Sequence, residues 1–441
     1  MRRTLITTSV VAMLAVAACS SSDTGGSASA PAVESAPASE SASAAASPSA
    51  SASGGTGMVD PASVSGDLTL QGWSAGAVEA PILQQVLDDF QAAYPQVKVA
   101  FEPVAGDYPA AMAAKFSSGD VPDVFYVDSG PAATWIDDGN LEPLDEYIAK
   151  TGVDTSVYYP AYLDAFKGAD GKIYGLPKDG NTIAMAYNED MLTAAGVTAP
   201  PTNWEELTAA VDKLKGTEGL DAPLCLSPSL DRALAFIYQA GGGLLTEDKT
   251  AAMIDTPESI TGIDTYLNFF KSGAAKRPAD TGDDWCGKSL GEGHSAIIFE
   301  GGWLDPYMKE TYPDVKYAWA EMPEGPAGKA TLGFTVAYAM GVDSQNKDAS
   351  WALIDYLTGP EGMKTWTEGG VANPSRSDLQ GAPGKEILIQ GSEYAHPWSF
   401  IPGFSEINDA FNNSLTAAIE GTGTAQDVAT APKTAIDSKL K

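Results

Sequence analysis

The sequence predicts an α/β protein with largely parallel sheets flanked by helices, and three observations support this prediction. Short apolar strands alternate with amphipathic helices, which is typical of parallel strands joined by helical crossovers. The chain has 441 residues, 44% of them hydrophobic, which allows a large core and two lobes or domains. The formal net charge of -32 and the pI near 4.2 indicate a soluble protein that does not bind a phosphate backbone, so no nucleic-acid partner is expected.

The N-terminus has the pattern of an exported protein. Arg2 and Arg3 precede an apolar run over 5–18, and small residues end this run directly before Cys19. The pattern resembles a bacterial lipoprotein signal peptide, which implies removal of residues 1–18 and lipidation of Cys19. The mature protein would then be anchored to the outer face of the cell membrane. A single transmembrane helix is the alternative, but the run is shorter than the roughly 20 residues that a bilayer requires.

Residues 20–57 consist almost entirely of Ser, Ala, Gly, Pro and Thr. Because they contain so few large apolar side chains, we expect a disordered tether, which extends with the next residues to 64. A flexible chain of roughly 40 residues has a root-mean-square reach of about 35 Å. This reach is enough to lift a globular domain off a lipid surface.

Two cysteines remain once Cys19 carries lipid. In an oxidising compartment, a disulfide between Cys225 and Cys286 is expected, and two buried free thiols are the alternative. Closing a loop of roughly 60 residues would stabilise the fold by about 4 kcal/mol in the chain-entropy model. No metal or other cofactor is expected, since His294 and His396 are the only histidines and neither has a CxxC partner.

The folded region begins with three strand–helix pairs. The apolar periodicity predicts the pairs 67–73 and 81–94, 97–101 and 108–117, and 124–128 and 131–138. Trp73 and Asp128 fall at the carboxyl ends of two of these strands, which is where α/β sheets bind ligands. A core tryptophan and a helix-capping aspartate are the alternatives.

A polar segment separates the next two predicted strands. The strands cover 173–176 and 183–187, and residues 177–181 between them are interpreted as a flexible crossing between lobes. Lys178 and Asp179 in this segment are either ligand contacts or part of a solvated turn.

The second half of the chain is richer in helices. Thr202 and Glu205 have capping-box spacing and predict the start of one helix. Asp231 and Arg232 begin another helix. Either their side chains point into a cleft, or the acid is there because a negative charge interacts favourably with the helix dipole at the first turn. This second helix covers 231–240. The other predicted elements are the helices 257–271, 350–358, 361–367, 406–419 and 425–440 and the strands 316–321 and 334–340.

The stretch 296–306, AIIFEGGWLDP, combines a buried strand with polar and aromatic side chains. The apolar run ends in Glu300, two glycines and Trp303, and a helix follows. A carboxylate accepts hydrogen bonds from hydroxyl groups, and the face of an indole packs on the C–H surface of a ring, so the pair suits a neutral sugar. A core tryptophan beside a solvated glutamate is the alternative.

Five stretches form a recognisable series along the chain, namely GWSAG at 72–76, SSGDVPDVFYVDS at 117–129, YGLPKDGNTIAMAYNEDML at 174–192, AIIFEGGWL at 296–304 and VANPSRSDL at 371–379. In this order they resemble the extracellular solute-binding proteins of ABC importers, family 1, the sugar-binding group that includes maltose-binding protein. The resemblance implies a type II periplasmic-binding-protein-like fold of two hinge-connected lobes. It also implies a monomeric binding protein without enzymatic activity, which captures a neutral mono- or oligosaccharide, for example an α-glucoside, and delivers it to a membrane permease.

The lobes and the binding residues follow from the resemblance by position. Lobe 1 would cover 65–179 and 335–373, and lobe 2 would cover 180–334 and 374–441, with crossings at 177–181, 333–335 and 373–376. The family's binding residues map by motif onto Trp73, Asp128, Ser129, Asp179, Glu300, Gly302, Trp303 and Arg376.

Trp303 matches the aromatic platform of the family best, and Glu300 is expected either to bind a sugar hydroxyl or to brace Arg376. Asp231 stands where maltose-binding relatives have an aromatic residue, which argues against a long maltodextrin. Outside the motifs, three further candidates are Trp285, His396 and Trp398.

Two other functions fit part of the pattern. The carboxylates and aromatic residues would also serve a surface glycoside hydrolase, although the helix-rich, two-lobed order argues against one. The acidic composition also permits a binding protein for another solute, such as a polyamine.

Overall fold

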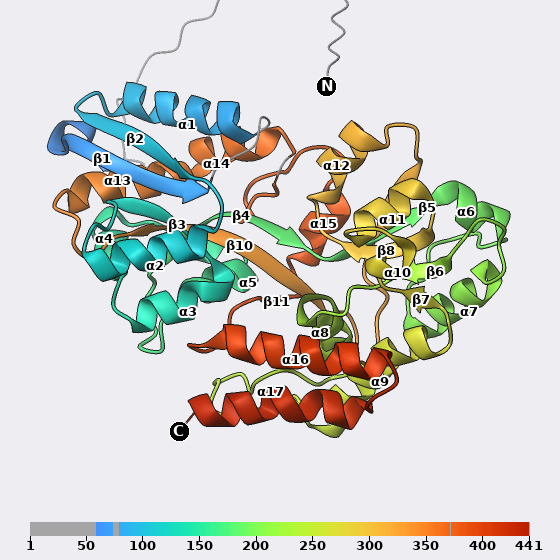
Figure 1. Cartoon of the computed structure of the whole chain (residues 1–441). Coiled ribbons are helices and arrows are strands. Elements are labelled where there is room, and N and C mark those ends of the chain that lie inside the picture. Colours follow the sequence, from blue (N-terminus) through green and yellow to red (C-terminus); the bar gives the residue numbers. More distant parts are fainter. Residues whose placement is uncertain (1–58, 74–78, 371, 441) are drawn as a thin grey trace, which may run out of the picture. The chain divides into compact units, whose positions relative to one another are not determined.

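The computed structural model (Figure 1) describes residues 59–73, 79–370 and 372–440. The predicted signal peptide, Cys19 and the tether up to residue 58 lie outside these residues. Residues 74–78, which include part of the stretch GWSAG, and Val371, the first residue of VANPSRSDL, also lie outside them. None of the described helices is long and apolar enough to cross a membrane. The described residues form two β-sheets, each with helices around a hydrophobic core of its own.

Six strands form the first sheet: β1 (Gly66–Trp73), β2 (Val97–Val104), β3 (Val124–Asp128), β4 (Gly175–Thr182), β10 (Thr331–Met340) and β11 (Ala395–Pro397). Their order is β11–β10–β3–β1–β2, and β4 also pairs with β10. β1 is parallel to β2 and β3, whereas β10 is antiparallel to β3 and β4. The carboxyl ends of β1, β2 and β3 therefore meet at one edge of the sheet.

Five strands form the second sheet: β5 (Ala184–Asn188), β6 (Ala222–Cys225), β7 (Ala275–Lys276), β8 (Ser295–Glu300) and β9 (Tyr317–Ala320). Their order is β7–β6–β8–β5–β9, in which β6 is parallel to β7 and β8, and β5 is antiparallel to β8 and β9. The carboxyl ends of β6 and β8 thus lie side by side.

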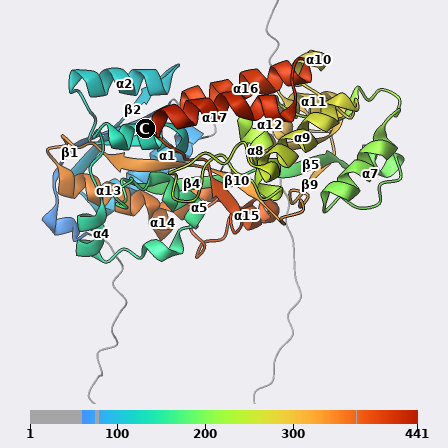
Figure 2. The same ribbon diagram turned by 90° about the horizontal axis from the view of Figure 1, so that it is seen from below.

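Helices account for most of the remaining chain. They are α1 (Glu79–Ala93), α2 (Tyr108–Ser118), α3 (Ser129–Asp137), α4 (Asp145–Thr151), α5 (Pro160–Leu163), α6 (Glu189–Ala194), α7 (Trp204–Leu214), α8 (Leu230–Gln239), α9 (Pro257–Lys271), α10 (Pro278–Thr281), α11 (Cys286–Glu292), α12 (Leu304–Thr311), α13 (Lys347–Thr358), α14 (Pro360–Glu368), α15 (Glu386–Gly391), α16 (Phe404–Ile419) and α17 (Ala425–Lys439), with three short 3-10 helices at Pro61–Ser63, Thr155–Val157 and Asp164–Phe166. On the first sheet, α1 packs with α13 and α14 on one face, while α2 and α3 lie on the other (Figure 1). Figure 2 shows α16 and α17 side by side.

The helices that the apolar periodicity predicted are present, because their buried faces repeat every three to four residues, whereas short helices such as α4, α6 and α15 were not predicted. In α1, for example, Leu83, Val86, Leu87 and Phe90 are all buried in the first core. One predicted helix start is wrong. Asn203, not Thr202, caps α7, and its side chain accepts a 2.9 Å hydrogen bond from the backbone of Glu206. Thr202 instead donates to the Glu206 carboxylate.

The predicted polar break at 177–181 is wrong, because these residues lie inside the continuous strand β4. The backbone of this segment pairs with β10, and the charges of Lys178 and Asp179 neutralise one another. Gly180 is needed for packing, since a Cβ atom there would lie 2.2 Å from a ring carbon of Tyr162. The polar composition therefore reflects a buried ion pair and a close packing contact rather than a turn.

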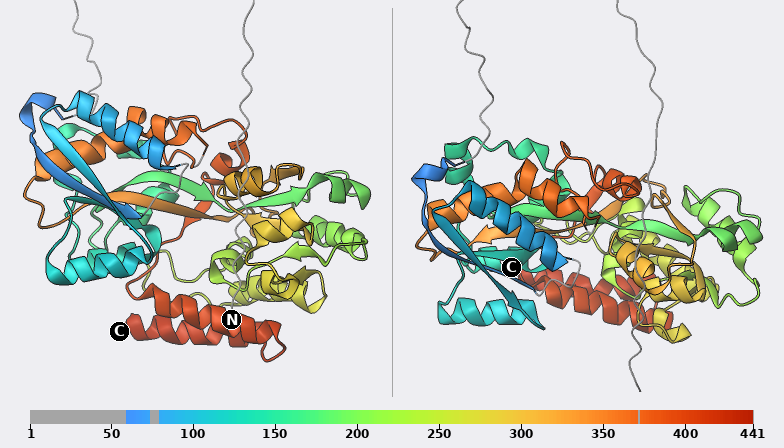
Figure 3. Two further views of the ribbon diagram at one scale, coloured as in Figure 1. Left: turned by 45° about the horizontal axis from the view of Figure 1, so that its top comes forward. Right: turned by 90° about the horizontal axis from the view of Figure 1, so that it is seen from above.

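Two long strands connect the two cores (Figure 3). In β10, Leu332 belongs to the core of the second sheet, whereas Val336 belongs to that of the first. In the same way, Leu176 of β4 lies in the first core, and Ile183 directly after β4 lies in the second. The lobe boundaries taken from the resemblance stay a prediction.

The disulfide between Cys225 and Cys286 is present, as predicted. It joins the last residue of β6 to the first residue of α11, across 61 positions of the sequence. Both cysteines lie in a small third core together with Leu290 and Ile298.

Candidate functional site

Three of the predicted residues line the carboxyl edge of the first sheet. Asp128 ends β3, and Val336 of β10 stands between Asp128 and Asp179 of β4 in the same row of the sheet. Trp73 ends the neighbouring strand β1 and packs edge-on against Tyr126, with ring centres 5.0 Å apart. Trp73 and Asp128 therefore lie at the same edge of the first sheet, at the ends of neighbouring parallel strands.

Asp128 uses one of its two carboxylate oxygens to cap a helix. One of its oxygens, Oδ1, accepts a 2.9 Å hydrogen bond from Gly130 at the start of α3, and Ser129 beside it is buried. Among the described residues, no side chain donates to the other oxygen, Oδ2. Burial raises the pKa of the Asp128 carboxyl, the Gly130 hydrogen bond opposes this effect, and the nearby Asp179 adds to it.

Asp179 is held by two protein groups, which both bind its oxygen Oδ2. Its carboxylate pairs with Lys178 and accepts a 2.9 Å hydrogen bond from Nε1 of Trp366 in α14. The Lys178 ammonium lies 3.9 Å from the centre of the Trp366 ring. Both charged residues are buried, at 3% and 7% exposure for Lys178 and Asp179 respectively. The arrangement indicates a structural ion pair at the junction of the two cores.

A second group of predicted residues lies at the carboxyl edge of the second sheet, around Arg232. Glu300 ends β8, and Asp231 and Arg232 lie at the start of α8, which follows β6. The Arg232 guanidinium binds Asp231 at 3.0 Å and Glu300 at 2.6 Å. It also donates from Nε to the backbone oxygen of Phe299 at 3.1 Å. Burial opposes ionisation of Arg232, but the attraction of Glu300 and Asp231 outweighs it and raises the pKa.

Trp303 is attached to the same cluster. Its indole Nε1 donates a 2.9 Å hydrogen bond to Oε2 of Glu300, the oxygen that also binds Arg232. The guanidinium carbon of Arg232 lies 5.5 Å from the centre of the Trp303 ring. Glu300 therefore braces Trp303 and Arg232, and the predicted alternative that it braces Arg376 is wrong.

The two glycines before Trp303 are required by close packing. A Cβ atom at Gly301 would lie 2.4 Å from a carbon of the Trp303 ring, and one at Gly302 would lie 2.7 Å from Oδ1 of Asn181. The carbonyl of Gly302 also accepts a 3.3 Å hydrogen bond from Nζ of the buried Lys385. The sequence EGGW is thus explained by the space that the indole and Asn181 occupy.

A row of aromatic rings links the two groups. Trp303 packs edge-on against Phe334 of β10 with ring centres 5.9 Å apart, and Phe334 lies 5.5 Å from Trp398. A Cβ atom at Gly130, close to Asp128 in the chain, would lie 3.6 Å from the indole nitrogen of Trp398. No hydrogen-bond acceptor for this nitrogen is found among the described residues. Trp398 and Oδ1 of Asp128 thus both lie near Gly130 at the start of α3.

Arg376 lies apart from both groups. It forms a bidentate pair with Asp378, at 2.9 and 2.8 Å, and its guanidinium carbon lies 5.5 Å from the Tyr158 ring centre. It also donates from Nη1 to the carbonyl of Thr358 at 3.4 Å. These contacts give Arg376 a bracing role on the outside of the first core.

Asp355 of α13, near Arg376, is buried at 7% exposure, and its Oδ2 has no hydrogen-bond partner among the described residues. Burial raises the pKa of this carboxyl to about 7, although Arg376 lowers it. Between pH 4 and pH 7 the folded protein therefore binds a proton that the unfolded chain has lost, so stability falls as the pH rises through this window. We expect Asp355→Asn to stabilise the protein by about 2 to 4 kcal/mol at pH 8.

The measurement is urea unfolding of the wild type and the Asp355→Asn variant at pH 5 and pH 8. The difference in free energy of unfolding between the two proteins should increase from pH 5 to pH 8. Asp348→Asn, on the exposed first turn of the same helix, is the control and should show a small gap at both values. A gap for Asp355→Asn that is equal at both pH values would contradict the prediction.

The structure places two other candidates in separate surroundings. The Trp285 ring packs on Tyr307, with centres 4.7 Å apart, beside the disulfide core. The His396 ring stacks on Tyr238 of α8 at 3.8 Å, and burial lowers the pKa of His396. No described contact joins Trp285 or His396 to Trp303.

Sequence reasoning missed the residues that connect the site. Phe334 was predicted only as the first residue of a strand, although its ring packs against both Trp303 and Trp398. The central role of Arg232 was also missed. The acid–base neighbours Asp231 and Arg232 at a helix start were a usable signal, because an arginine there can reach the end of an adjacent parallel strand.

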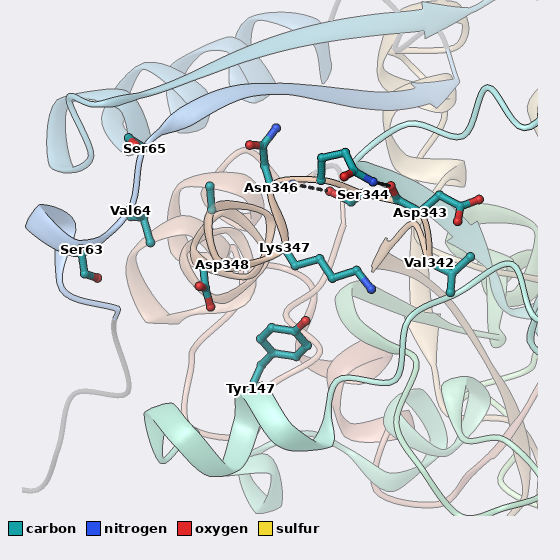
Figure 4. Close-up of a pocket in the computed structure, with 12 residues that line it drawn as sticks. Ser63, Val64, Ser65, Tyr147, Val342, Asp343, Ser344, Asn346, Lys347 and Asp348 are labelled. Carbon is teal, nitrogen blue, oxygen red and sulfur yellow. Dashed lines mark hydrogen bonds between the residues drawn. The ribbon is translucent and has the colours of Figure 1, made fainter.

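A pocket of about 650 Å³ lies at the opposite edge of the first sheet (Figure 4). It is formed by residues 63–65 before β1, by Tyr147 of α4 and by residues 342–349 after β10. Of its charged side chains, Lys347 already pairs with Glu142 at 2.8 Å and Asp348 with Lys150 at 3.2 Å. No predicted ligand residue lines this pocket.

The comparisons with known proteins agree with this architecture. Residues 76–364 match the family described as bacterial extracellular solute-binding protein. A binding protein of Brucella abortus is 25% identical over 370 residues, which cover 79% of this chain and 87% of that protein. A maltooligosaccharide ABC transporter solute-binding lipoprotein of Streptococcus pneumoniae is 26% identical over 344 residues, which cover 74% and 78%.

A solved structure is similar over nearly its whole length. The ABC substrate-binding protein of Listeria monocytogenes in complex with cycloalternan superposes with a TM-score of 0.74 at 23% identity and covers 85% of this chain and 98% of that one. This similarity shows the fold. The predicted fold class, a type II periplasmic-binding-protein-like α/β fold, is confirmed.

Proposed function

Because the chain belongs to the bacterial extracellular solute-binding protein family, we propose that it is the substrate-binding component of an ABC sugar importer. Its ligand would be a neutral mono- or oligosaccharide, such as an α-glucoside, delivered to a membrane permease. The name of the Streptococcus pneumoniae relative, which refers to maltooligosaccharides, supports this ligand class.

The observation that carries the proposal is the row Trp303–Phe334–Trp398, which ends beside Asp128. Trp303 offers aromatic surface for the C–H face of a sugar ring. Trp398 offers an indole N–H and Asp128 offers its oxygen Oδ2, and neither has a hydrogen-bond partner among the described residues, so both suit the hydroxyl groups of a sugar.

The charges of the site also favour a neutral ligand. Lys178 and Asp179 neutralise one another, and Arg232 is balanced by Glu300 and Asp231. With these charges paired inside the protein, hydrogen bonds and stacking remain for the ligand. Asp128 is the exception, and its carboxylate would accept from a hydroxyl.

Sugar binding would act on a hinge between two lobes. The long strands β4 and β10 connect both cores, so they are the candidate hinge strands. A ligand that contacts Asp128 at one sheet and Trp303 at the other has a higher affinity for a closed form, and it shifts the population towards that form. The permease would recognise the closed form.

We further propose a monomer that binds without catalysis and is anchored through lipidated Cys19 to the outer face of the cell membrane. The description of the Streptococcus pneumoniae relative as a lipoprotein supports the anchor. The predicted tether would then connect the lipid to the folded region.

The test is calorimetry on the protein without its predicted signal peptide, against glucose, maltose, maltotriose, a cyclic α-glucan and spermidine. We expect micromolar or tighter binding of at least one sugar. A ligand at a hundred times its dissociation constant should also stabilise the fold by about 2.7 kcal/mol. Binding of spermidine alone would favour the polyamine alternative, and release of reducing ends from a polysaccharide would favour a hydrolase. If no sugar binds, the proposal fails.

A further inference from the structure

Glu300 is a buried carboxylate that the fold cannot leave unpaired. It is 2% exposed, and its oxygen Oε2 receives both Nη2 of Arg232 at 2.6 Å and Nε1 of Trp303 at 2.9 Å. An isolated charge at such a position is strongly unfavourable. The two donors thus share one oxygen, and the position of Glu300 sets the position of the indole.

Arg232 is in turn fixed by groups other than Glu300. Nε donates to the carbonyl of Phe299 at 3.1 Å, and Nη1 donates to the carboxylate of Asp231 at 3.0 Å and to its backbone oxygen at 3.3 Å. The Asp231 carboxylate accepts a further hydrogen bond from Ser229. The planar guanidinium therefore spans from the start of α8 to the end of β8, which a lysine ammonium cannot do.

The Trp303 indole is restrained on several sides. Its N–H points to Glu300, its six-membered ring lies against the backbone of Gly301, and its edge packs on Phe334. Since the N–H is already donated within the protein, the ring surface is the part of Trp303 that a ligand can use. How strongly that surface can bind a ligand depends on the orientation of the ring.

We infer that Arg232 is a positioning residue, which fixes the ring surface of Trp303 through Glu300. The consequence for affinity rests on the proposed sugar-binding function, whereas the orientation of the indole can be measured without a ligand. If Arg232 only neutralised the charge of Glu300, its replacement by another cation would leave the indole unchanged.

The test compares Arg232→Lys with Arg277→Lys. Arg277 is a matched control, because it also pairs with an aspartate and a glutamate, Asp280 at 2.8 Å and Glu420 at 3.0 Å, but at the surface. The first readout is the indole N–H resonance of Trp303 in the ligand-free, nitrogen-labelled protein, assigned with Trp303→Phe. We expect Arg232→Lys to shift or broaden this resonance and Arg277→Lys to leave it in place.

The second readout is the affinity for maltotriose. We expect Arg232→Lys to weaken binding about tenfold in the wild-type background and to have no further effect in a Trp303→Ala background. An unchanged Trp303 resonance, or an equal loss in both backgrounds, overturns the inference. If the wild type does not bind maltotriose, the Trp303 resonance still tests the positioning role of Arg232. The absence of binding would then count against maltotriose as the ligand and not against this role. If Arg232→Lys does not fold, Asp231→Asn, which weakens the hold on Nη1 of Arg232 and leaves Glu300 and Trp303 unchanged, supplies the same two readouts.

Discussion

Replacing Trp303 with alanine is expected to lower sugar affinity roughly 30- to 150-fold, which corresponds to about 2 to 3 kcal/mol of lost apolar contact and stacking. The expectation follows from the position of Trp303 at the carboxyl end of β8, where its half-buried ring ends the aromatic row that reaches Trp398. Trp303→Phe keeps an aromatic face but loses the hydrogen bond to Glu300, so an intermediate loss is expected. Calorimetry with the sugar that binds the wild type measures both.

Trp204→Phe is the control for these variants. Trp204 also belongs to the second core, where its ring stacks on Phe236 with centres 5.9 Å apart and its nitrogen donates to Gln239. This variant is expected to lower the unfolding temperature without changing sugar affinity. If Trp303→Ala binds sugar as tightly as the wild type does, Trp303 is a core residue and the platform must be sought elsewhere.

Removing the carboxylate of Asp179 is expected to lower the free energy of unfolding by about 3 to 5 kcal/mol, because it leaves Lys178 as an uncompensated buried charge. The Lys178 side chain is 4% exposed, and Asp179 is the acid in contact with it among the described residues. Trp366 would also lose the acceptor of its indole N–H. Urea unfolding followed by circular dichroism measures the effect of Asp179→Ala.

Two further variants separate a structural role of Asp179 from a ligand contact. The double variant Lys178→Met/Asp179→Asn removes both charges and is expected to recover most of the stability. Asp348→Ala breaks the exposed pair with Lys150 and should cost less than about 1 kcal/mol. If Asp179→Ala were as stable as Asp348→Ala, the buried ion pair would have no structural role, and a sugar contact would become the better explanation for Asp179.

The secondary structure could be predicted where burial has a simple period. The strand–helix pairs from β1 to α3, the helices α8 and α9 and the strand β8 have one apolar face or an apolar run, and the predicted ranges fall within a few residues of the observed ones. β4 could not be recognised, because both of its faces are buried and the charged residues Lys178 and Asp179 interrupt its apolar run. A sequence shows that these residues are charged, but not that they pair with each other inside a sheet.

The site was predicted in parts. The rule that ligands bind at the carboxyl ends of parallel strands selected Trp73 and Asp128, and both lie at that edge of the first sheet. The partners of Glu300 depend on which helix start lies beside β8, and strand order is not encoded in local periodicity. Arg376 was therefore expected near Glu300, whereas Arg232 occupies that place.

The sheet order also has a consequence for the assembly of the protein during export. β4 pairs only with β10 among the described strands, and β10 follows β4 by about 150 positions of the chain, so the first sheet lacks its central strand until residue 340 has emerged. Pairings so distant in sequence form slowly. The first core therefore closes only after about three quarters of the chain have emerged, and the second core, which includes Phe411 and Ile436, closes later still.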